Sequence, residues 1–394
     1  MTILCAADYG RGIFALKHFR LAALLVALAL APQASAKSFK FAFQGDLNAL
    51  DPHTLNESFT LGALGNVYEG LTKRDKDLKI VPGLAERWEI VEPTKWRFYL
   101  RKGVKFHDGS PFTADDVIFS FERLRAPNVT MRNKIDASTV ISKIDDFTVE
   151  MVTKQPNPIL HAELDTLYML SKTWAEANGA QQTQSMSASG LNAWALKANG
   201  TGPFVITSHQ PGVKTEFKVN PNWWDKSEHN LTEVTFQTIK SDATRVAALL
   251  SGEIDMMEPV PVQDIDRLKA APNVKVLTGP EIRTIFFGLD QMRDELLYSS
   301  VKGKNPFKDA RVRKAIYQAI DIEAIRTRVM RGMSTPSALL ISPLLYTRSG
   351  EFKRHPYDVA AAKKLLTEAG YPNGFEVRMD CPNDRYVADE AICQ

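Results

Sequence analysis

The sequence predicts a mixed protein of the α/β or α+β type that is built from lobes. Segments in which apolar and polar residues alternate, such as residues 96–100, recur along the chain and predict strands with one face toward a core. Segments with apolar residues at helical spacing, such as residues 309–320, predict amphipathic helices. Strands and helices are interspersed without strict alternation, which argues against a barrel or a helix bundle. The 394 residues allow two or three domains.

The predicted strands share an alternation of apolar and polar side chains. Trp96, Phe98 and Leu100 point to one side, and Arg97 and Tyr99 point to the other. The same pattern, or a short run rich in aromatic and β-branched residues, marks the other strands. The expected strands lie at residues 39–43, 96–100, 147–151, from 201–204 onward, 215–219, 234–238 and 282–288.

The predicted helices are marked by their ends. Thr113, with Asp116 three residues on, supplies both members of a capping box. Asp309 and Asp358 are placed to cap two later helices, and Gly370 is placed to close the second of them. The expected helices lie at residues 61–71 with Gly70 as the exit, from 113 onward, at 242–251 with Gly252 as the stop, at 309–320, at 358–370, and at the start of a further helix in 384–394.

The first 36 residues have the features of a secretory signal peptide. Lys17, His18 and Arg20 form a basic region that precedes a short apolar run at residues 21–30. That run is too short for the roughly 20 residues that a membrane span needs. An A-x-A cleavage pattern ends at Ala36, and no cysteine follows the apolar run as a lipid attachment point. We therefore expect export, cleavage near Ala36 and, in a cell with an outer membrane, a periplasmic product.

Charge and motif content exclude several classes of function. The formal net charge of +3 falls to about +1 once the presequence is removed, so nothing indicates a nucleic acid or an anionic membrane as partner. None of the common nucleophile-elbow, zinc-protease, phosphate-loop or dinucleotide-binding motifs occurs. We expect no catalytic residues, no metal site and no cofactor. His53, His107 and His355 are interpreted as ordinary surface or turn residues.

Two features near the middle and the end of the chain stand apart from the predicted elements. Residues 181–190 (QQTQSMSASG) are polar and are expected to form a surface loop. Cys381 and Cys393 are the cysteines that remain after cleavage. In an oxidising compartment they can pair across the short loop between them, and the alternative is two buried or reactive thiols.

Several short motifs follow one another in an order that resembles the family 5 extracellular solute-binding proteins. These are the oligopeptide, dipeptide, nickel and opine receptors of bacterial ATP-binding cassette (ABC) importers, and they mostly bind and release ligands without chemistry. Any one motif is weak evidence, but the ordered set extends over residues 37–394. The matching elements are Leu50-Asp51-Pro52-His53, Tyr68-Glu69-Gly70-Leu71, residues 84–120, Gly200-Thr201-Gly202-Pro203-Phe204, Asn220-Pro221-Asn222-Trp223-Trp224, Gly252-Glu253-Ile254-Asp255, 309–321 and 361–375.

The resemblance implies a two-lobed α/β fold of the periplasmic-binding-protein (Venus flytrap) type, in which closure about a hinge buries a ligand. It places lobe I at residues 37–280 with an inserted subdomain at about 75–199. The outgoing hinge crossing falls at 281–290. Lobe II starts in 291–394 and is incomplete, because family members continue past this point by about a quarter of their pattern.

The resemblance also implies a function and a set of ligand contacts. The expected function is capture of di- and oligopeptides and their delivery to an inner-membrane permease with its ATPase subunits, by a protein that acts as a monomer. Asn56 and Ser58 match the segment that pairs with the ligand backbone, and Thr284 and Phe286 lie on the hinge strand, where sheet packing is the alternative. Nickel chelates, opines, glutathione or oligosaccharides stay open as ligands, and a periplasmic hydrolase is the alternative from another class.

Two pairs within these motifs have structural interpretations. Trp223 and Trp224 are expected to pack in a core or against a sheet more than to form a ligand platform. Arg311 and Arg313 are expected on a solvated or ion-paired helix face.

Overall fold

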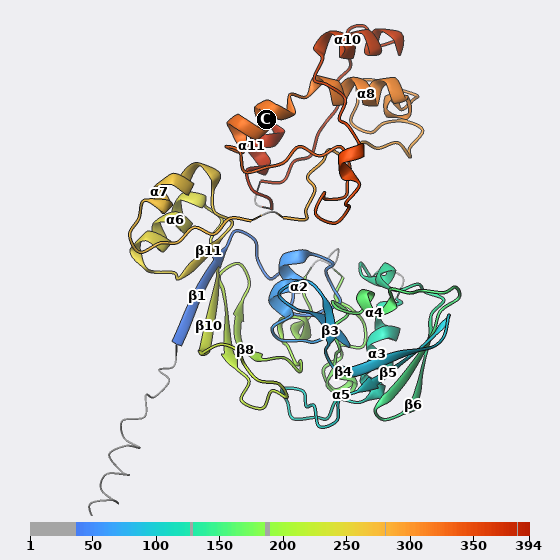
Figure 1. Cartoon of the computed structure of the whole chain (residues 1–394), viewed down its shortest axis with the longest axis vertical. Helices are drawn as coiled ribbons and strands as arrows, with labels where there is room; N and C mark the ends of the chain where they lie inside the picture. The colour runs from blue at the N-terminus through green and yellow to red at the C-terminus, as the bar shows by residue number, and fades with distance from the viewer. Residues whose placement is uncertain (1–36, 127–128, 186–189, 280, 384) are drawn as a thin grey trace, which may run out of the picture. The chain divides into compact units, whose positions relative to one another are not determined.

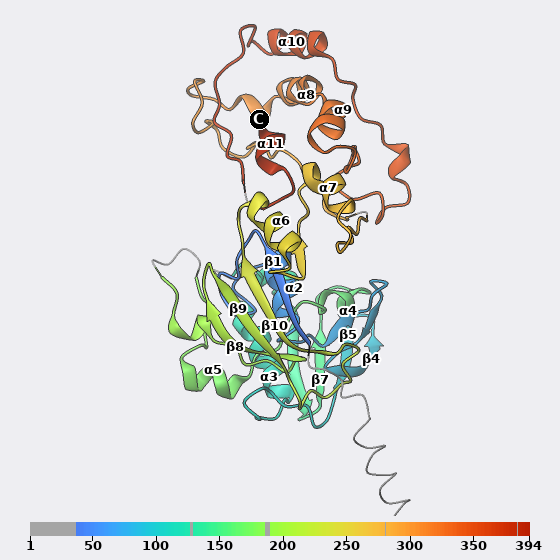
Figure 2. The ribbon, with the colours of Figure 1, turned by 90° about the vertical axis from the view of Figure 1, so that its left-hand side faces the viewer.

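A computed structural model describes residues 37–126, 129–185, 190–279, 281–383 and 385–394, so the predicted signal peptide lies outside the described residues. The chain divides into two compact units, which are described separately. Unit 1 comprises residues 37–39 with Ala49–His209 and Glu216–Thr235, and unit 2 comprises Lys40–Asn48, Gln210–Thr215 and Phe236–Gln394. Figure 1 and Figure 2 show the elements of both units in ribbon form.

Within the described residues the strands form three sheets. A five-stranded sheet has the order β11-β1-β10-β9-β8, a four-stranded sheet has the order β4-β5-β7-β6, and β2 pairs with β3. The bounds are β1 Lys37–Phe43, β2 Thr72–Arg74, β3 Ile80–Pro82, β4 Ala85–Glu92, β5 Lys95–Leu100, β6 Val140–Asp145, β7 Thr148–Val152, β8 Phe204–Gln210, β9 Lys214–Val219, β10 Leu231–Thr238 and β11 Met256–Glu258.

The four-stranded sheet supplies part of the core of unit 1. On β5, Trp96, Phe98 and Leu100 are buried, and the residues between them are half-buried, as the alternation predicts. The neighbouring strands are antiparallel, with Trp96 opposite Met151 and Phe98 opposite Val149. Buried side chains from adjacent strands thus lie side by side and stabilise the sheet by packing.

The helices begin where the capping residues predict. The backbone N–H of Thr113 donates to the Asp116 carboxylate at 2.9 Å, and the Asp358 carboxylate accepts from the N–H of Ala361 at 2.8 Å. The bounds are α2 Ser58–Leu64, α3 Ala114–Leu124, α4 Leu160–Glu163, α5 Lys172–Asn178, α6 Asp242–Ser251, α7 Ile265–Lys269, α8 Ala310–Ala319, α9 Ile322–Ala324, α10 Val359–Glu368 and α11 Asp389–Cys393, with short turns at Arg132–Lys134, Ala193–Leu196, Val262–Asp264, Pro306–Lys308, Ile325–Val329 and Ser349–Glu351.

Unit 2 has its own apolar clusters. Val246, Ile254 and Met257 pack with Ala42 and Leu268 in one of them. In another, Leu296, Phe307 and Val312 form the centre, and Leu366 of α10 packs against it. Helices α8 and α10 lie side by side in both ribbon views. Amphipathic helix faces therefore bury the apolar residues that the helical spacing identifies.

Unit 2 contains the two arginines and the two cysteines that the sequence analysis singled out. Arg311 forms an ion pair with Asp309 at 2.6 Å, as expected for an ion-paired helix face. Arg313 donates to the backbone carbonyls of Phe307 and Lys308. A disulfide joins Cys381 to Cys393, whose Cα atoms are 6.4 Å apart.

Two predicted elements are wrong. The helix expected at residues 61–71 begins at Ser58 and ends at Leu64. Gly65 and not Gly70 follows the end of this helix. A Cβ atom added at Gly70 would lie 2.6 Å from the carbonyl oxygen of Leu164. Gly70 is thus required for close approach of two backbones. The strand expected at residues 282–288 is absent from the described residues of that segment, and Phe286 is 63% exposed.

The domain boundaries inferred from the resemblance stay predictions, including the hinge at 281–290. In the part of the chain that the structure describes, every helix is too short or too polar to cross a membrane. The same residues contain no group of three or more His, Cys, Asp or Glu side chains arranged to hold a metal ion.

Candidate functional site

The predicted ligand-contact residues lie in two different segments. Asn56 and Ser58 are exposed at the start of α2 in unit 1. Thr284 is half-buried and Phe286 is exposed in an irregular segment of unit 2. The chain on both sides of Asn56 and Ser58 is held by hydrogen bonds to buried groups.

The segment that presents Asn56 and Ser58 is fixed on its downstream side by a helix cap. The residue between them, Glu57, has an extended backbone and accepts hydrogen bonds from the N–H groups of Phe59 at 3.0 Å and Thr60 at 2.8 Å. These bonds satisfy N–H groups in the first turn of α2 that lack intrahelical partners. The cap turns the Glu57 carboxylate toward the helix and leaves its two polar neighbours facing solvent.

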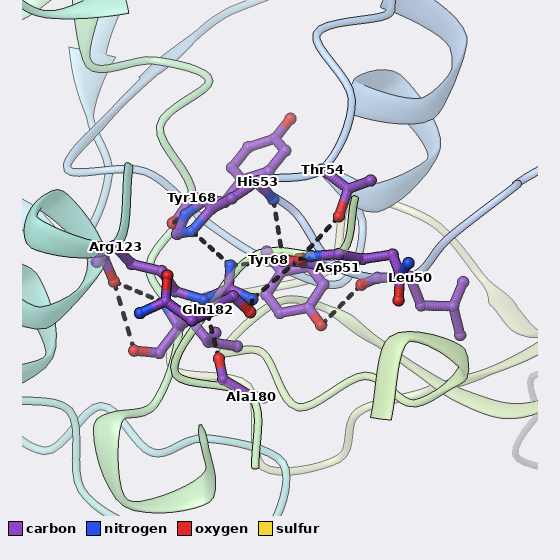
Figure 3. A network of polar contacts seen from close by, with 12 residues as sticks. Leu50, Asp51, His53, Thr54, Tyr68, Arg123, Tyr168, Ala180 and Gln182 are labelled. Carbon is purple, nitrogen blue, oxygen red and sulfur yellow. Dashed lines mark hydrogen bonds and ion pairs between the residues drawn. The ribbon is translucent and has the colours of Figure 1, made fainter. Parts of the chain in front are cut away.

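On the upstream side, a buried ion pair holds the chain. Both guanidinium ends of Arg123 on α3 reach the Asp51 carboxylate, at 2.7 Å and 2.9 Å (Figure 3). The exposed fraction of the side chain is 0% for Arg123 and 1% for Asp51. The carboxylate also accepts from the Thr54 hydroxyl at 2.8 Å and the His53 N–H at 3.2 Å. These contacts fold residues 51–54 into a turn around one charged group.

Arg123 uses all of its donors. Its Nε donates to the carbonyl of Ala180, and Nη2 donates to the carbonyl of Gln182, both at 2.9 Å (Figure 3). The remaining Nη1 donor reaches Nδ1 of His53 at 3.0 Å. A buried guanidinium is tolerated when each N–H has an acceptor, and this one meets that condition.

Residues 186–189 of the expected surface loop lie outside the described residues, and its described part, residues 181–185 and 190, is more than a polar surface loop. Gln184 is buried, and its backbone N–H donates to the Asp51 carboxylate at 3.1 Å. Its side chain accepts from the N–H of Asn192 at 2.8 Å. The surface expectation is wrong at Gln184, because the acidic centre of the neighbouring turn binds this backbone.

His53 is likewise not a surface residue. It is 0% exposed, and its Nε2 donates to the carbonyl of Tyr168 at 2.8 Å, while Nδ1 accepts from Arg123 (Figure 3). Burial and the adjacent guanidinium lower the pKa of His53 to about 4, so the ring is neutral near pH 7. Burial alone would raise the pKa of Asp51, but the charge and hydrogen bonds of Arg123 outweigh it and the pKa is lowered.

Two buried tyrosines complete the surroundings of this turn. The hydroxyl of Tyr68 donates to the carbonyl of Leu50 at 3.1 Å, just upstream of Asp51 (Figure 3). The hydroxyl of Tyr168 donates to the carbonyl of Leu61 at 2.7 Å, within α2. Burial raises the pKa of both hydroxyls, so both act as neutral donors.

A second buried carboxylate joins three of the sequence motifs. Glu69 accepts from the indole N–H of Trp224 at 2.9 Å, the indole N–H of Trp223 at 3.3 Å and the Thr201 hydroxyl at 2.8 Å. Burial raises the pKa of Glu69, against the opposing effect of these hydrogen bonds. The tryptophans are half-buried and serve as donors to Glu69, which the packing expectation did not include.

Sequence reasoning missed Arg123, although a signal for it exists. Asp116, Ser120 and Arg123 have the spacing i, i+4, i+7, so they share one face of α3. That face is the buried one, because Val117, Phe121 and all three polar residues are buried. Polar residues on the apolar face of an amphipathic helix predict buried hydrogen-bonded partners.

Comparison with known proteins identifies the family. The model described as "Bacterial extracellular solute-binding proteins, family 5 Middle" matches residues 79–394. The chain therefore belongs to the family 5 bacterial extracellular solute-binding proteins, whose structural class is the two-lobed α/β fold.

Three relatives illustrate the range of names in this family. The chain is 29% identical to Heme-binding protein A of Haemophilus influenzae over 82% of this chain and 61% of that protein. It is 27% identical to the Dipeptide-binding protein of Escherichia coli over 90% of this chain and 67% of that protein. The structure of the periplasmic binding protein DppA from Helicobacter pylori in complex with peptide STSA matches with a TM-score of 0.71 and 27% identity, over 86% of this chain and 67% of that one. The chain spans less than two thirds of the length of the first of these relatives.

Proposed function

We propose that this protein is the substrate-binding component of a bacterial ABC importer and that it captures di- and oligopeptides. It releases them unchanged to an inner-membrane permease that is driven by its ATPase subunits, and it acts as a monomer without catalysis. Family membership supports the class of function. A relative named for dipeptides and a similar structure that holds a peptide support the class of ligand.

The observation that carries this proposal is the segment at residues 55–58, in which Asn56 and Ser58 are exposed above a buried polar base. The chain is extended at Glu57, with φ −132° and ψ 131°, but the Glu57 carbonyl already accepts from the N–H of Leu61 at 2.9 Å, so a peptide strand is proposed to pair with the main chain just before it, at residues 55 and 56. Asn56 and Ser58 flank Glu57 and face solvent. Recognition through the main chain tolerates different ligand side chains, which suits a peptide receptor.

The remaining parts of the proposal follow the family pattern. Thr284 and Phe286 are proposed as further ligand contacts, and the hinge at residues 281–290 is proposed to let the lobes close over the ligand. Residues 1–36 are proposed as a signal peptide that is cleaved near Ala36, which places the mature protein in the periplasm.

Heme is a second candidate ligand because a relative is named for it, and the sequence reasoning did not include it. Nickel chelates, opines, glutathione and oligosaccharides stay as alternatives within the same fold. A hydrolase is the alternative from another class.

A thermal-shift screen of the mature protein tests the proposal. Its panel comprises di- to hexapeptides, heme, glutathione, opines, oligosaccharides and nickel chelates. A ligand at about 100 times its Kd stabilises the folded state by about 2.7 kcal/mol, which gives a measurable rise in Tm. Peptides are expected to give that rise, and the Asn56→Ala, Ser58→Ala double variant is expected to give a smaller one, because it keeps the main-chain groups and removes only the side-chain contacts. A rise with only sugars, nickel or heme would overturn the peptide assignment, and cleavage of a bound peptide would indicate the hydrolase.

A further inference from the structure

One residue contacts both ends of the proposed ligand-contact segment. Upstream of the segment, His53 donates from Nε2 to the backbone carbonyl of Tyr168 at 2.8 Å. Downstream, the Tyr168 hydroxyl donates to the backbone carbonyl of Leu61 at 2.7 Å. One bond uses the backbone carbonyl of Tyr168 and the other uses its hydroxyl, so Tyr168 connects His53 to Leu61 across residues 54–60.

Tyr168 is itself held firmly. It is 7% exposed, and a Cβ atom added at Gly65 would lie 2.6 Å from its hydroxyl oxygen, so the end of α2 closes tightly on the phenol. The next two residues are also fixed through their N–H groups. Met169 donates to the carbonyl of Glu69, and Leu170 donates to the Ser120 hydroxyl, both at 2.9 Å. A residue with a fixed backbone and a packed ring can set the distance between the two flanks.

We propose that Tyr168 is a positioning residue that fixes the conformation of residues 55–58, and so sets the ligand affinity of this segment without touching the ligand. This inference rests on the proposed function for its effect on binding. Its effect on the segment itself does not depend on any ligand. Removal of the hydroxyl breaks the bond between the Tyr168 ring and the downstream flank, while the backbone carbonyl of Tyr168 still accepts from His53.

Tyr68 offers a matched control. It is also a buried tyrosine whose hydroxyl donates to one backbone carbonyl, that of Leu50 at 3.1 Å. Leu50 lies upstream of the Asp51 turn and Tyr68 lies beyond the end of α2, so this bond encloses residues 54–60 from farther out and contacts neither of the flanking residues His53 and Leu61. Leu61 keeps a second donor in the N–H of Gly65 at 2.8 Å, so loss of the Tyr168 hydroxyl leaves a helix carbonyl that is still paired. Tyr68→Phe is therefore expected to cost at least as much overall stability as Tyr168→Phe.

The first measurement is amide hydrogen exchange in the full chain without ligand. Tyr168→Phe is expected to speed exchange at residues 59–61 about fivefold, as loss of one buried hydrogen bond predicts. Tyr68→Phe is expected to leave exchange at these amides within about twofold of the wild type. Equal exchange at residues 59–61 in the two variants would overturn the proposal.

The second measurement is the Kd of the tetrapeptide Ser-Thr-Ser-Ala for the wild type, Tyr168→Phe, Tyr68→Phe and Asn56→Ala, at a temperature where all are folded. Tyr168→Phe is expected to weaken binding about fivefold and Tyr68→Phe to leave it within about twofold. If the wild type binds and Asn56→Ala weakens binding but Tyr168→Phe does not, the positioning role is wrong and the proposed function stands. If the wild type binds neither this tetrapeptide nor any of the di- to hexapeptides of the thermal-shift panel, the peptide proposal is contradicted, and the exchange experiment still decides whether Tyr168 holds the segment.

Discussion

Replacement of Arg123 by methionine is the sharpest test of the buried network. The change removes a guanidinium that donates five hydrogen bonds and leaves the Asp51 carboxylate, whose side chain is 1% exposed, without its ionic partner. Breaking a buried ion pair by removing one member costs about 3–5 kcal/mol, because the remaining charge stays buried and uncompensated. Arg123→Met is therefore expected to lower the free energy of unfolding of unit 1 by about that amount near pH 7.5.

The loss is expected to depend on pH with a definite sign. In the wild type the pKa of Asp51 is lowered, so its stabilising contribution is present above the usual carboxyl range and lost as pH falls below it. Without Arg123, burial raises that pKa instead, and the penalty of the ionised form is relieved when the carboxyl binds a proton. The difference between variant and wild type is expected to shrink as pH is lowered from about 7.5 toward about 5.

Urea denaturation followed by tryptophan fluorescence measures this difference. All six tryptophans of the chain lie in unit 1, so their emission reports on that unit. The control is Arg97→Met, which breaks a 2.9 Å pair with Glu150 where the arginine side chain is 31% exposed. Such pairs contribute up to about 1 kcal/mol. A loss under about 1 kcal/mol for Arg123→Met, or a loss that is the same at both pH values, would refute the reasoning.

Three further predictions use the same fluorescence assay. The pKa of His53 is lowered to about 4, so its contribution to stability is present above about pH 6.5 and is lost as pH falls toward 4, by about 3 kcal/mol in all. His53→Gln should flatten this dependence, and an unchanged slope would count against a neutral buried ring. Glu69→Gln places an amide N–H₂ where donors already converge, so it should cost about 1–3 kcal/mol; a neutral effect would show that the indole bonds to Glu69 contribute little. Gly70→Ala should cost about 2 kcal/mol or more, because its Cβ would lie 2.6 Å from a backbone oxygen, whereas Gly62→Ala in α2 meets no atom within 4 Å and should be neutral or stabilising. Equal effects at the two glycines would contradict the close approach.

Local sequence patterns predicted much of the fold because they act over a few residues. The alternation at residues 96–100 and the caps at Thr113, Asp309 and Asp358 each depend on neighbours within one strand or one turn. These elements formed where the sequence indicated.

The errors at His53, Gly70 and Gln184 and the omission of Arg123 have a different origin, since each depends on a partner far along the chain. Arg123 and Asp51 are 72 residues apart, and His53 and Tyr168 are 115 residues apart. Gly70 resembles a helix exit in sequence, but its role is set by the distant backbone of Leu164. Single-sequence patterns predict element type well and do not reveal which distant groups meet in the core.

The sequence predicted only the exposed part of the candidate site. The resemblance pointed to Asn56 and Ser58, and the structure places both on the surface next to a fixed turn. It did not reveal the base beneath them, which consists of Asp51, His53 and Arg123. That base is formed by contacts between loops and a helix, and such contacts leave little trace in local sequence.

Equilibrium dialysis against a mixture of di- to hexapeptides, glutathione and oligosaccharides, with mass spectrometry of the bound and free fractions, tests the central claim most directly. The account predicts close to one intact peptide per protein chain, enrichment of peptides over glutathione and sugars, and no cleavage products in either fraction. Absence of any bound peptide, or the appearance of shortened peptides that depend on the protein, would contradict it.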